Sequence, residues 1–132
     1  MAYRLSQRSE KALIGVHPDL VACVRRALEL TTQDFTVVEG LRALERQREL
    51  VAKGASKTLK SRHLKQADGY GHAVDLYPYY SRSVQVDAPF SRFRAIADAM
   101  KQAAAELGVV ITWGGDWKSF VDSPHYQLER GR

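Results

Sequence analysis

The sequence is poor in several features that would assign it to a special class of protein. It has one cysteine, Cys23, so no disulfide can form within the chain. It has no run approaching the ~18 apolar residues that cross a bilayer. Residues 1–15 lack the apolar stretch and small-residue cleavage site of a secretory signal, so we expect synthesis in the cytoplasm without a signal peptide. Cys23 stands between apolar neighbours, which favours a core residue over a nucleophile.

The chain has the length and composition of one folded domain, which we expect to span residues 1–132. Apolar residues make up 45% of it and charged residues 27%, as in ordinary globular proteins. Apolar spacing and end signals predict helices at 6–14, 18–31, 43–54 and 92–108. Apolar and β-branched runs predict strands at 34–40, 71–78, 109–114 and 124–129. This order indicates an α+β fold, with helices packed around a small, mostly antiparallel sheet.

The net charge of +5 arises in the first half of the chain. Residues 1–66 carry 13 Lys and Arg against 7 Asp and Glu. A basic segment, residues 53–65, contains no acid, and its cations are Lys53, Lys57, Lys60, Arg62 and Lys65. Such a patch favours polyanionic partners such as nucleic acid, an acidic polymer or an anionic membrane, and the alternative is a solvated loop. The segment lacks the interleaved aromatics and recognition-helix pattern of a nucleic-acid binder.

Two stretches combine histidine with aspartate, and the first is "SRHLKQADGYGHAVDL" at residues 61–76. If its last residues form a strand, side chains alternate between the two faces, so His72 and Asp75 point to opposite sides. The small residues around them leave room beside Asp75. We therefore expect His63, from the preceding loop, to share an ion with Asp75 in preference to His72.

The second stretch is "WGGDWKSFVDSPHYQL", residues 113–128. Pro124 disfavours a helix at the residue before it, so Asp122 and His125 do not lie on successive helical turns. We expect His125 to begin a strand and to share one face of it with Gln127. Asp122 can then fold back over whatever His125 binds, where a carboxylate near a metal can act as a general base.

Arg42 is a further candidate because it follows a predicted strand and a glycine. A guanidinium at that position can reach into a cleft and hold a carboxylate or a carbonyl oxygen. The alternative is a surface salt bridge with Glu39 or Glu45.

Taken together, these motifs resemble those of a known family. S-x-H, G-x-A-x-D and W-G-G-D-W-x-x-F-x-D-x-P-H are similar to motifs of the zinc peptidases that cut bacterial cell-wall peptides. That family includes D-Ala-D-Ala carboxypeptidases and dipeptidases, and phage endolysins that are L-alanyl-D-glutamate endopeptidases. "VHPDL" and "VVEGLRALERQ" resemble the endolysin branch, and the resemblance covers roughly residues 16–128.

The resemblance implies a Zn²⁺ site whose three protein ligands are His63, Asp75 and His125, with one position left open for catalysis. It implies that Asp122 is the catalytic acidic residue. Arg42 matches the family arginine that binds substrate or stabilises developing negative charge, so it is both a catalytic and a substrate-binding candidate.

Three more positions receive supporting roles from the same resemblance. Ser61 is expected to contact substrate or to support the site from behind the ligands. Asp116 and Trp117 lie in the W-G-G-D-W segment and are expected to stand behind the ligands, with Asp116 able to orient a ligand histidine.

The chain departs from the family pattern between the first two ligands. His63 and Asp75 are twelve residues apart, whereas about seven is common in the family. The segment around residues 65–70 therefore looks like an inserted loop, and Asp68 or His72 can compete as ligands.

The function implied is a zinc metallopeptidase that hydrolyses peptidoglycan stem peptides, most simply at the L-alanyl-D-glutamate bond. A D-Ala-D-Ala carboxypeptidase shares the same ligands and is the alternative, and a non-catalytic zinc-binding module of the hedgehog type is a third. The implied partner is peptidoglycan. The chain is expected to act as a monomer, without a separate cell-wall-binding domain. Neither nucleic acid nor a stable membrane contact is expected. Such an endolysin would collect in the host cytoplasm and act on the wall after release.

Overall fold

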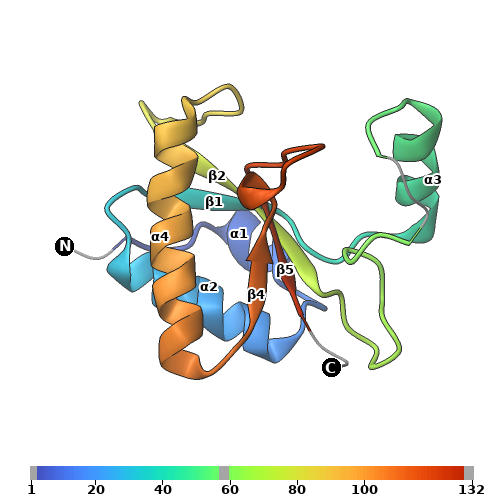
Figure 1. Cartoon of the computed structure of the whole chain (residues 1–132), viewed down its shortest axis with the longest axis horizontal. Coiled ribbons are helices and arrows are strands. Elements are labelled where there is room, and N and C mark those ends of the chain that lie inside the picture. Colours follow the sequence, from blue (N-terminus) through green and yellow to red (C-terminus); the bar gives the residue numbers. More distant parts are fainter. Residues whose placement is uncertain (1–2, 57–59, 130–132) are drawn as a thin grey trace.

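The computed structural model describes residues 3–56 and 60–129 and shows helices around one sheet (Figure 1). The first half contains α1 (Gln7–Ala12), α2 (Pro18–Leu30), β1 (Phe35–Glu39) and α3 (Leu44–Ala52). The second half contains β2 (Ala73–Tyr80), β3 (Ser83–Val84), α4 (Phe90–Leu107), β4 (Ile111–Trp113), a 3₁₀ turn η1 (Gly114–Asp116) and β5 (His125–Leu128). The predicted α+β class is confirmed, and each predicted helix and strand exists with ends shifted by a few residues.

The sheet has the strand order β1-β2-β5-β4, and its neighbouring strands run antiparallel, with β3 pairing with the far end of β2. The register sets Glu39 of β1 opposite Asp75 of β2, and Asp75 opposite His125 of β5. These three side chains therefore form a row across three adjacent strands, although they are far apart in the sequence.

Side-chain alternation along the strands separates the core from this row. Val74 of β2 and Tyr126 of β5 are buried in the core with α2 and α4, whereas Asp75 and His125 point to the other face of the sheet. Cys23 is fully buried in α2, and burial together with Asp19 raises the pKa of its thiol to about 11. The prediction that Cys23 is a core residue is confirmed.

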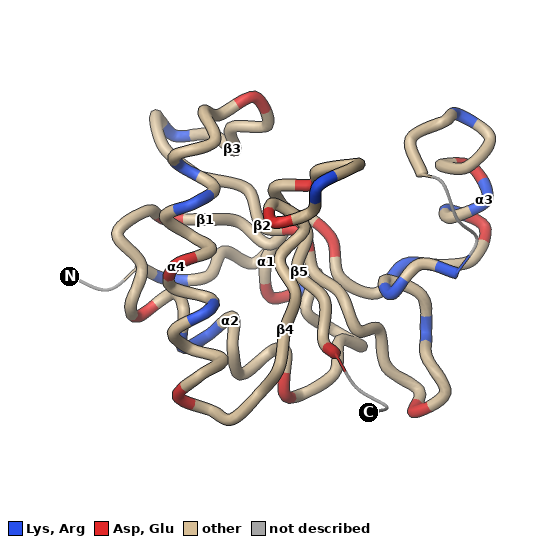
Figure 2. The backbone as a smooth tube through the Cα atoms, in the orientation of Figure 1, with Lys and Arg blue, Asp and Glu red and all other residues tan. Residues whose placement is uncertain are grey.

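α3 differs from the other helices because it stands away from the sheet (Figure 1). Within its nine residues, all of them described, Gln47 is the one buried side chain. Lys and Arg are frequent along α3 and the segment that joins it to β2 (Figure 2). Lys57 of the predicted basic segment lies outside the described residues.

Among the described residues, the helices are too short or too polar to cross a membrane.

Candidate metal centre

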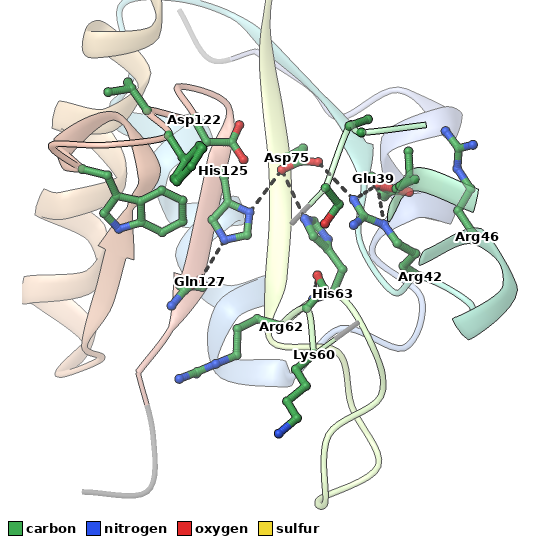
Figure 3. A pocket seen from close by; sticks show the side chains of 18 of the residues that line it. Glu39, Arg42, Arg46, Lys60, Arg62, His63, Asp75, Asp122, His125 and Gln127 are labelled. Carbon is green, nitrogen blue, oxygen red and sulfur yellow. Dashed lines mark hydrogen bonds and ion pairs between the residues drawn. The ribbon is translucent and has the colours of Figure 1, made fainter. Parts of the chain in front are cut away.

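Two histidines and one aspartate converge on the open face of the sheet. His63 comes from the loop before β2, Asp75 from β2 and His125 from the first position of β5. One ligand-type atom from each lies within 4.8 Å of the other two. Oδ1 of Asp75 lies 3.2 Å from Nε2 of His63 and 3.5 Å from Nδ1 of His125 (Figure 3). The three side chains that the sequence predicts as ligands therefore meet, and the grouping needs no rearrangement of the chain.

His63 is held by backbone groups on its outer side. Its Nδ1 lies 2.9 Å from the carbonyl oxygen of Gly40, which can only accept, so Nδ1 donates to that oxygen and Nε2 is the ring atom that faces Asp75. An added Cβ at Gly40 would lie 2.0 Å from the carbonyl oxygen of Ala12, so glycine lets the chain that carries this carbonyl pack directly against the end of α1. The Ser61 hydroxyl accepts from the His63 backbone N–H at 3.1 Å, so Ser61 shapes the turn that presents the imidazole.

The inward-facing atoms fit a metal cation. If both imidazoles are neutral and carry their protons on the outer nitrogens, three electron pairs face one another, on Nε2 of His63, Nδ1 of His125 and Oδ1 of Asp75. These electron pairs repel one another, and a positive charge between them removes the repulsion. A proton or a metal ion can supply that charge. Two histidine nitrogens and one carboxylate oxygen are the donor set of catalytic zinc sites, which leave a fourth position open.

Asp75 and His125 shift the pKa of one another. Burial alone would raise the pKa of Asp75, but the hydrogen bonds and charges of His125 and His63 outweigh it and hold that pKa well below its usual range. Burial disfavours the charged form of His125, yet the hydrogen bond and charge of Asp75 prevail and raise the pKa of His125. In the metal-free protein the carboxylate is therefore ionised and the centre favours an added positive charge.

Asp122 lies above His125 in the same cleft (Figure 3). Burial and the charge of Asp75 raise its pKa, against the opposing effect of His125, His63 and Arg42. Its carboxylate makes no hydrogen bond or salt bridge with the part of the chain that the structure describes, and a half-buried carboxylate with a raised pKa is suited to accept a proton.

Glycine in the turn that precedes Asp122 permits this placement. The Asp122 backbone N–H donates to the carbonyl oxygen of Gly114 at 3.0 Å, and an added Cβ at Gly114 would lie 2.3 Å from the Asp122 carbonyl oxygen. The indole of Trp113 fixes the end of the same loop by donating to the carbonyl oxygen of Ser123 at 2.6 Å.

Arg42 is almost fully buried beside the centre. Its guanidinium donates through Nε and Nη2 to Glu39 and through Nη1 to Oε1 of Gln47 at 2.7 Å. Nη2 lies 3.8 Å from Oδ2 of Asp75. The salt bridge with Glu39 that the sequence offered as an alternative is present, and it holds Arg42 at the centre. Glu39, which sequence reasoning did not select as a site residue, is its main partner.

The remaining predicted positions divide into two groups. The ring centroids of Trp117 and His125 lie 5.3 Å apart, so the indole covers that imidazole. Asp116 instead accepts from Lys101 of α4 at 2.7 Å, and the outer ring nitrogens of His63 and His125 contact the carbonyl oxygen of Gly40 and Oε1 of Gln127. The expectation that Asp116 orients a ligand histidine is therefore corrected, because η1 turns its carboxylate toward the helix.

Asp68 and His72 pair with one another and stay outside the centre. Nε2 of His72 lies 2.8 Å from Oδ2 of Asp68, and His17 approaches the same oxygen at 3.7 Å. This contact ties the loop at 65–70 to the start of α2, so the competing ligands considered from the sequence are engaged elsewhere.

The centre lies at the floor of an open cleft of about 790 Å³. One wall contains Arg46 and Leu50 of α3, with Lys60 and Arg62 on the segment that follows. The other wall is the loop before β5, which presents three apolar side chains, Trp117, Phe120 and Val121. The cleft therefore has one basic and one apolar side.

Comparison with known proteins gives consistent relatives. A family model described as phage L-alanyl-D-glutamate peptidase matches residues 1–132. The L-alanyl-D-glutamate peptidase of Escherichia phage T5 is 34% identical over 99% of this chain and 93% of its own length. The L-alanyl-D-glutamate peptidase of Listeria phage A118 is 34% identical over 72% of this chain and 30% of its own length.

Solved structures are similar as well. The Serratia marcescens L-Ala D-Glu endopeptidase ChiX aligns with a TM-score of 0.85 and 44% identity, covering 97% of this chain and 91% of that one. The vancomycin-resistance D,D-dipeptidase VanXYg aligns with a TM-score of 0.51 and 16% identity, covering 86% of this chain and 50% of its own, which indicates a shared fold alone.

Proposed function

This chain belongs to the phage L-alanyl-D-glutamate peptidase family, and we propose that it is a zinc metallopeptidase that cuts this bond in peptidoglycan stem peptides. His63, Asp75 and His125 are the proposed zinc ligands, Asp122 the general acid–base and Arg42 the residue that offsets negative charge. The convergence of three electron-pair donors within 4.8 Å, in a cleft open to a peptide, is the observation that supports the proposal most strongly.

The proposed metal has a defined chemical task at this position. When bound, zinc supplies a Lewis acid for the scissile carbonyl and acidifies a water molecule. His63, Asp75 and His125 would hold it at the floor of the cleft. Three protein ligands with one open position are the arrangement of catalytic rather than structural zinc.

Asp122 moves the proton. Its partly buried carboxylate takes the proton released when water attacks the alanyl carbonyl carbon. The same group then gives that proton to the amine nitrogen of D-glutamate as the peptide bond breaks. A carboxyl with a raised pKa performs both steps more readily than an exposed one, because it holds the proton long enough to deliver it.

Arg42 supplies fixed positive charge beside the reacting carbonyl. Glu39 and Gln47 use three of its five N–H groups, which leaves two N–H donors for oxygen atoms of the substrate. Because the guanidinium is held before substrate arrives, it needs no reorganisation during the reaction.

The basic wall of the cleft fits the leaving half of the substrate. D-Glutamate keeps one carboxylate free even when its other carboxyl group is linked onward, so an anion lies close to the scissile bond. Arg62 is paired with Glu129, whereas Arg46 has no ion pair within the described part of the chain. Arg46 on α3 is therefore the cation proposed to meet this carboxylate (Figure 3).

Mass spectrometry of digested peptidoglycan tests the proposal. Purified peptidoglycan is incubated with the metal-free protein, with and without added zinc. New peptides that begin with a free D-glutamate amine, formed in the zinc sample, support it. Release of terminal D-alanine instead would assign a carboxypeptidase, and equal cleavage in the metal-free sample would exclude the metal mechanism.

A further inference from the structure

The two walls of the cleft differ in charge. Its lysine and arginine side chains come from α3 and the segments beside it: Arg42, Arg46, Lys60 and Arg62. The opposite side, which we call the loop wall, is the loop of residues 117–122, and among its described residues that line the cleft Asp122 is the one charged side chain. Figure 3 shows Asp122 and Arg46 on opposite sides of Asp75. A substrate that crosses the site therefore meets cations on one side and a carboxylate on the other.

The loop wall presents apolar surface as far as its rim. Trp117 lies against His125, with ring centroids 5.3 Å apart, and so forms the inner part of the wall. Further along the loop, the side chains of Phe120 and Val121 are 72% and 55% exposed. Adjacent large apolar side chains that are exposed at a cleft are typical of a binding surface, because their contact with water is unfavourable until a ligand covers them.

The backbone of Phe120 has a conformation that bulky residues avoid. Its φ is 51°, in the left-handed region. The ends of the loop are held by the carbonyl oxygen of Gly114, which accepts from the backbone N–H groups of Trp117 at 3.2 Å and Asp122 at 3.0 Å. The Phe120 ring gains little burial in return for this strain, so the fold alone does not account for it. Strain of this kind is often found where a side chain contacts a ligand.

The substrate of the proposed reaction is as unequal as the cleft. On the amine side of the scissile bond, D-glutamate carries a free carboxylate. On the acyl side, L-alanine is joined through a lactyl group to the muramic acid of the glycan, and this half offers methyl groups and a pyranose ring without a charge. Charge complementarity therefore places the amine side against Arg46 and the uncharged acyl side against the loop wall. The reverse placement would bring a carboxylate toward Asp122.

We infer that the loop wall binds the glycan side of the stem peptide, with the Phe120 ring against the muramic acid sugar, so that glycan-linked stem peptides are cleaved in preference to free ones. The apolar C–H face of a pyranose packs on an aromatic ring, and this contact needs an exposed, flat side chain. The inference rests on the proposed function, whose substrate it narrows. In a free peptide an ammonium group replaces the sugar, and it would have to lose water against Trp117 and Phe120.

Three substrates with the same L-alanyl-D-glutamate bond test the preference. Their L-alanine nitrogen carries N-acetylmuramic acid in amide linkage, carries an acetyl group, or is left as a free amine. The acetylated peptide removes the ammonium charge without adding the sugar, so it separates the two causes. With the zinc-loaded wild-type protein, kcat/KM for the muramyl peptide should exceed that for the acetylated peptide about 3- to 10-fold, mainly through KM. Equal values for these two substrates would overturn the inference.

Substitutions of Phe120 test the ring itself. Phe120→Ala should bring the ratio of these two kcat/KM values close to one, whereas Phe120→Tyr keeps the flat face and should keep the ratio within about twofold of the wild type. Ile14→Ala is the matched control, because Ile14 is also 72% exposed but does not line the cleft, and it should keep the wild-type ratio. If Phe120→Ala lowered kcat/KM for both substrates by the same factor, the ring would act on the loop instead of the sugar, and the inference would be wrong.

Phe120→Gly separates recognition from folding. Glycine adopts a φ of 51° without strain, and the exposed ring contributes little burial, so this variant should unfold at or above the Tm of the wild type. Its ratio of kcat/KM values should fall as in Phe120→Ala. A clearly lower Tm would assign the ring to the fold and contradict the inference.

Binding to the metal-free protein distinguishes this inference from the proposed function. N-acetylmuramyl-L-alanine amide contains the acyl half without the scissile bond, and N-acetyl-L-alanine amide is its control. Because Trp117 lies in the loop wall, the muramyl ligand should change the tryptophan fluorescence of the wild type, and its Kd should rise about 3- to 10-fold in Phe120→Ala. A protein that binds this ligand but cleaves none of the three substrates would remove the proposed function and leave the sugar contact intact. Cleavage of all three at equal rates, without a fluorescence response, would do the reverse.

Discussion

Asp75 and His125 are register partners on adjacent antiparallel strands, and Oδ1 of Asp75 lies 3.5 Å from Nδ1 of His125. Two of the three proposed ligands are thus positioned by the backbone hydrogen bonds of the sheet and need no loop to bring them together. The third ligand, His63, is brought to them by a turn that is bonded to Gly40. Substitutions in the cleft walls are therefore expected to change catalysis while this arrangement persists.

Asp122→Asn should separate catalysis from metal binding. The amide cannot accept the proton from water, so kcat should fall about 10²- to 10⁴-fold, while zinc content stays near that of the wild type because Asp122 is not a proposed ligand. Peptide release from peptidoglycan and atomic absorption measure the two quantities. Asp116→Asn is the control, since Asp116 pairs with Lys101, and it should leave both unchanged. Wild-type turnover by Asp122→Asn would remove Asp122 from the mechanism.

Stability should depend on pH in opposite ways with and without zinc. The pKa of His125 is raised in the metal-free fold, so its contribution is full below the unfolded value of about 6.5 and is lost as pH rises through the folded pKa. Zinc requires the unprotonated imidazole, so the gain in Tm on adding zinc should grow between pH 5.5 and 8. Thermal unfolding in chelator and in zinc measures both. An equal zinc gain at the two pH values would contradict the assignment.

The lowered pKa of Asp75 should make the metal-free fold lose stability at acid pH. Its contribution to the stability of the metal-free fold is full above the unfolded pKa of about 3.9 and is lost as pH falls toward the lower folded pKa. Asp75→Asn should therefore flatten the fall in Tm below pH 4, as well as abolish zinc binding. A variant that keeps the full acid dependence would show that another carboxyl group causes it.

Gly114→Ala should displace the loop that presents Asp122. The new Cβ would lie 2.3 Å from the Asp122 carbonyl oxygen, so we expect a loss of about 1–3 kcal/mol in unfolding free energy together with reduced kcat. Gly108→Ala is the control, because Gly108 has a positive φ of 69° and open space around it. It should lower stability by about 1 kcal/mol without changing kcat, since it strains a distant helix end.

Arg46→Ala should weaken recognition of the free carboxylate. Because Arg46 is exposed, the expected rise in KM is modest, about two- to fivefold, and it should shrink at high salt. Arg48→Ala removes an exposed arginine from the same helix that does not line the cleft, and it should leave KM unchanged. Equal effects of the two variants would indicate general attraction to an anionic wall instead of a specific contact.

The sequence was enough to predict which strand residues point toward the site and which toward the core, because side-chain alternation along a strand is a local property. Alternation in β2 separates Asp75 from Val74, and alternation in β5 places His125 with Gln127. The same alternation places Gln127 beside His125 on one face of β5, whereas the contact of its amide with the imidazole depends on side-chain rotamers and could not be predicted.

Other features depend on contacts between distant segments and could not be predicted. Glu39 joins the site only through the register of β1 with β2. The direction of the Asp116 side chain could not be predicted, because the 3₁₀ turn points its carboxylate toward Lys101 of α4 and away from the histidines. The hairpin to β3 turns through Ser81 and Arg82 at positive φ, without the glycine that usually marks such a turn.

The separation of α3 from the sheet gives the chain two parts that can change independently. Arg46 and Leu50 of α3 line one wall of the cleft, and Gln47 is the one buried side chain of this helix. Exchanging the outward positions of this helix is therefore expected to change which cell-wall chemistries are accepted, while the row of Glu39, Asp75 and His125 stays as it is. For the redirection of such a lytic protein to a different bacterial host, α3 is the segment to diversify.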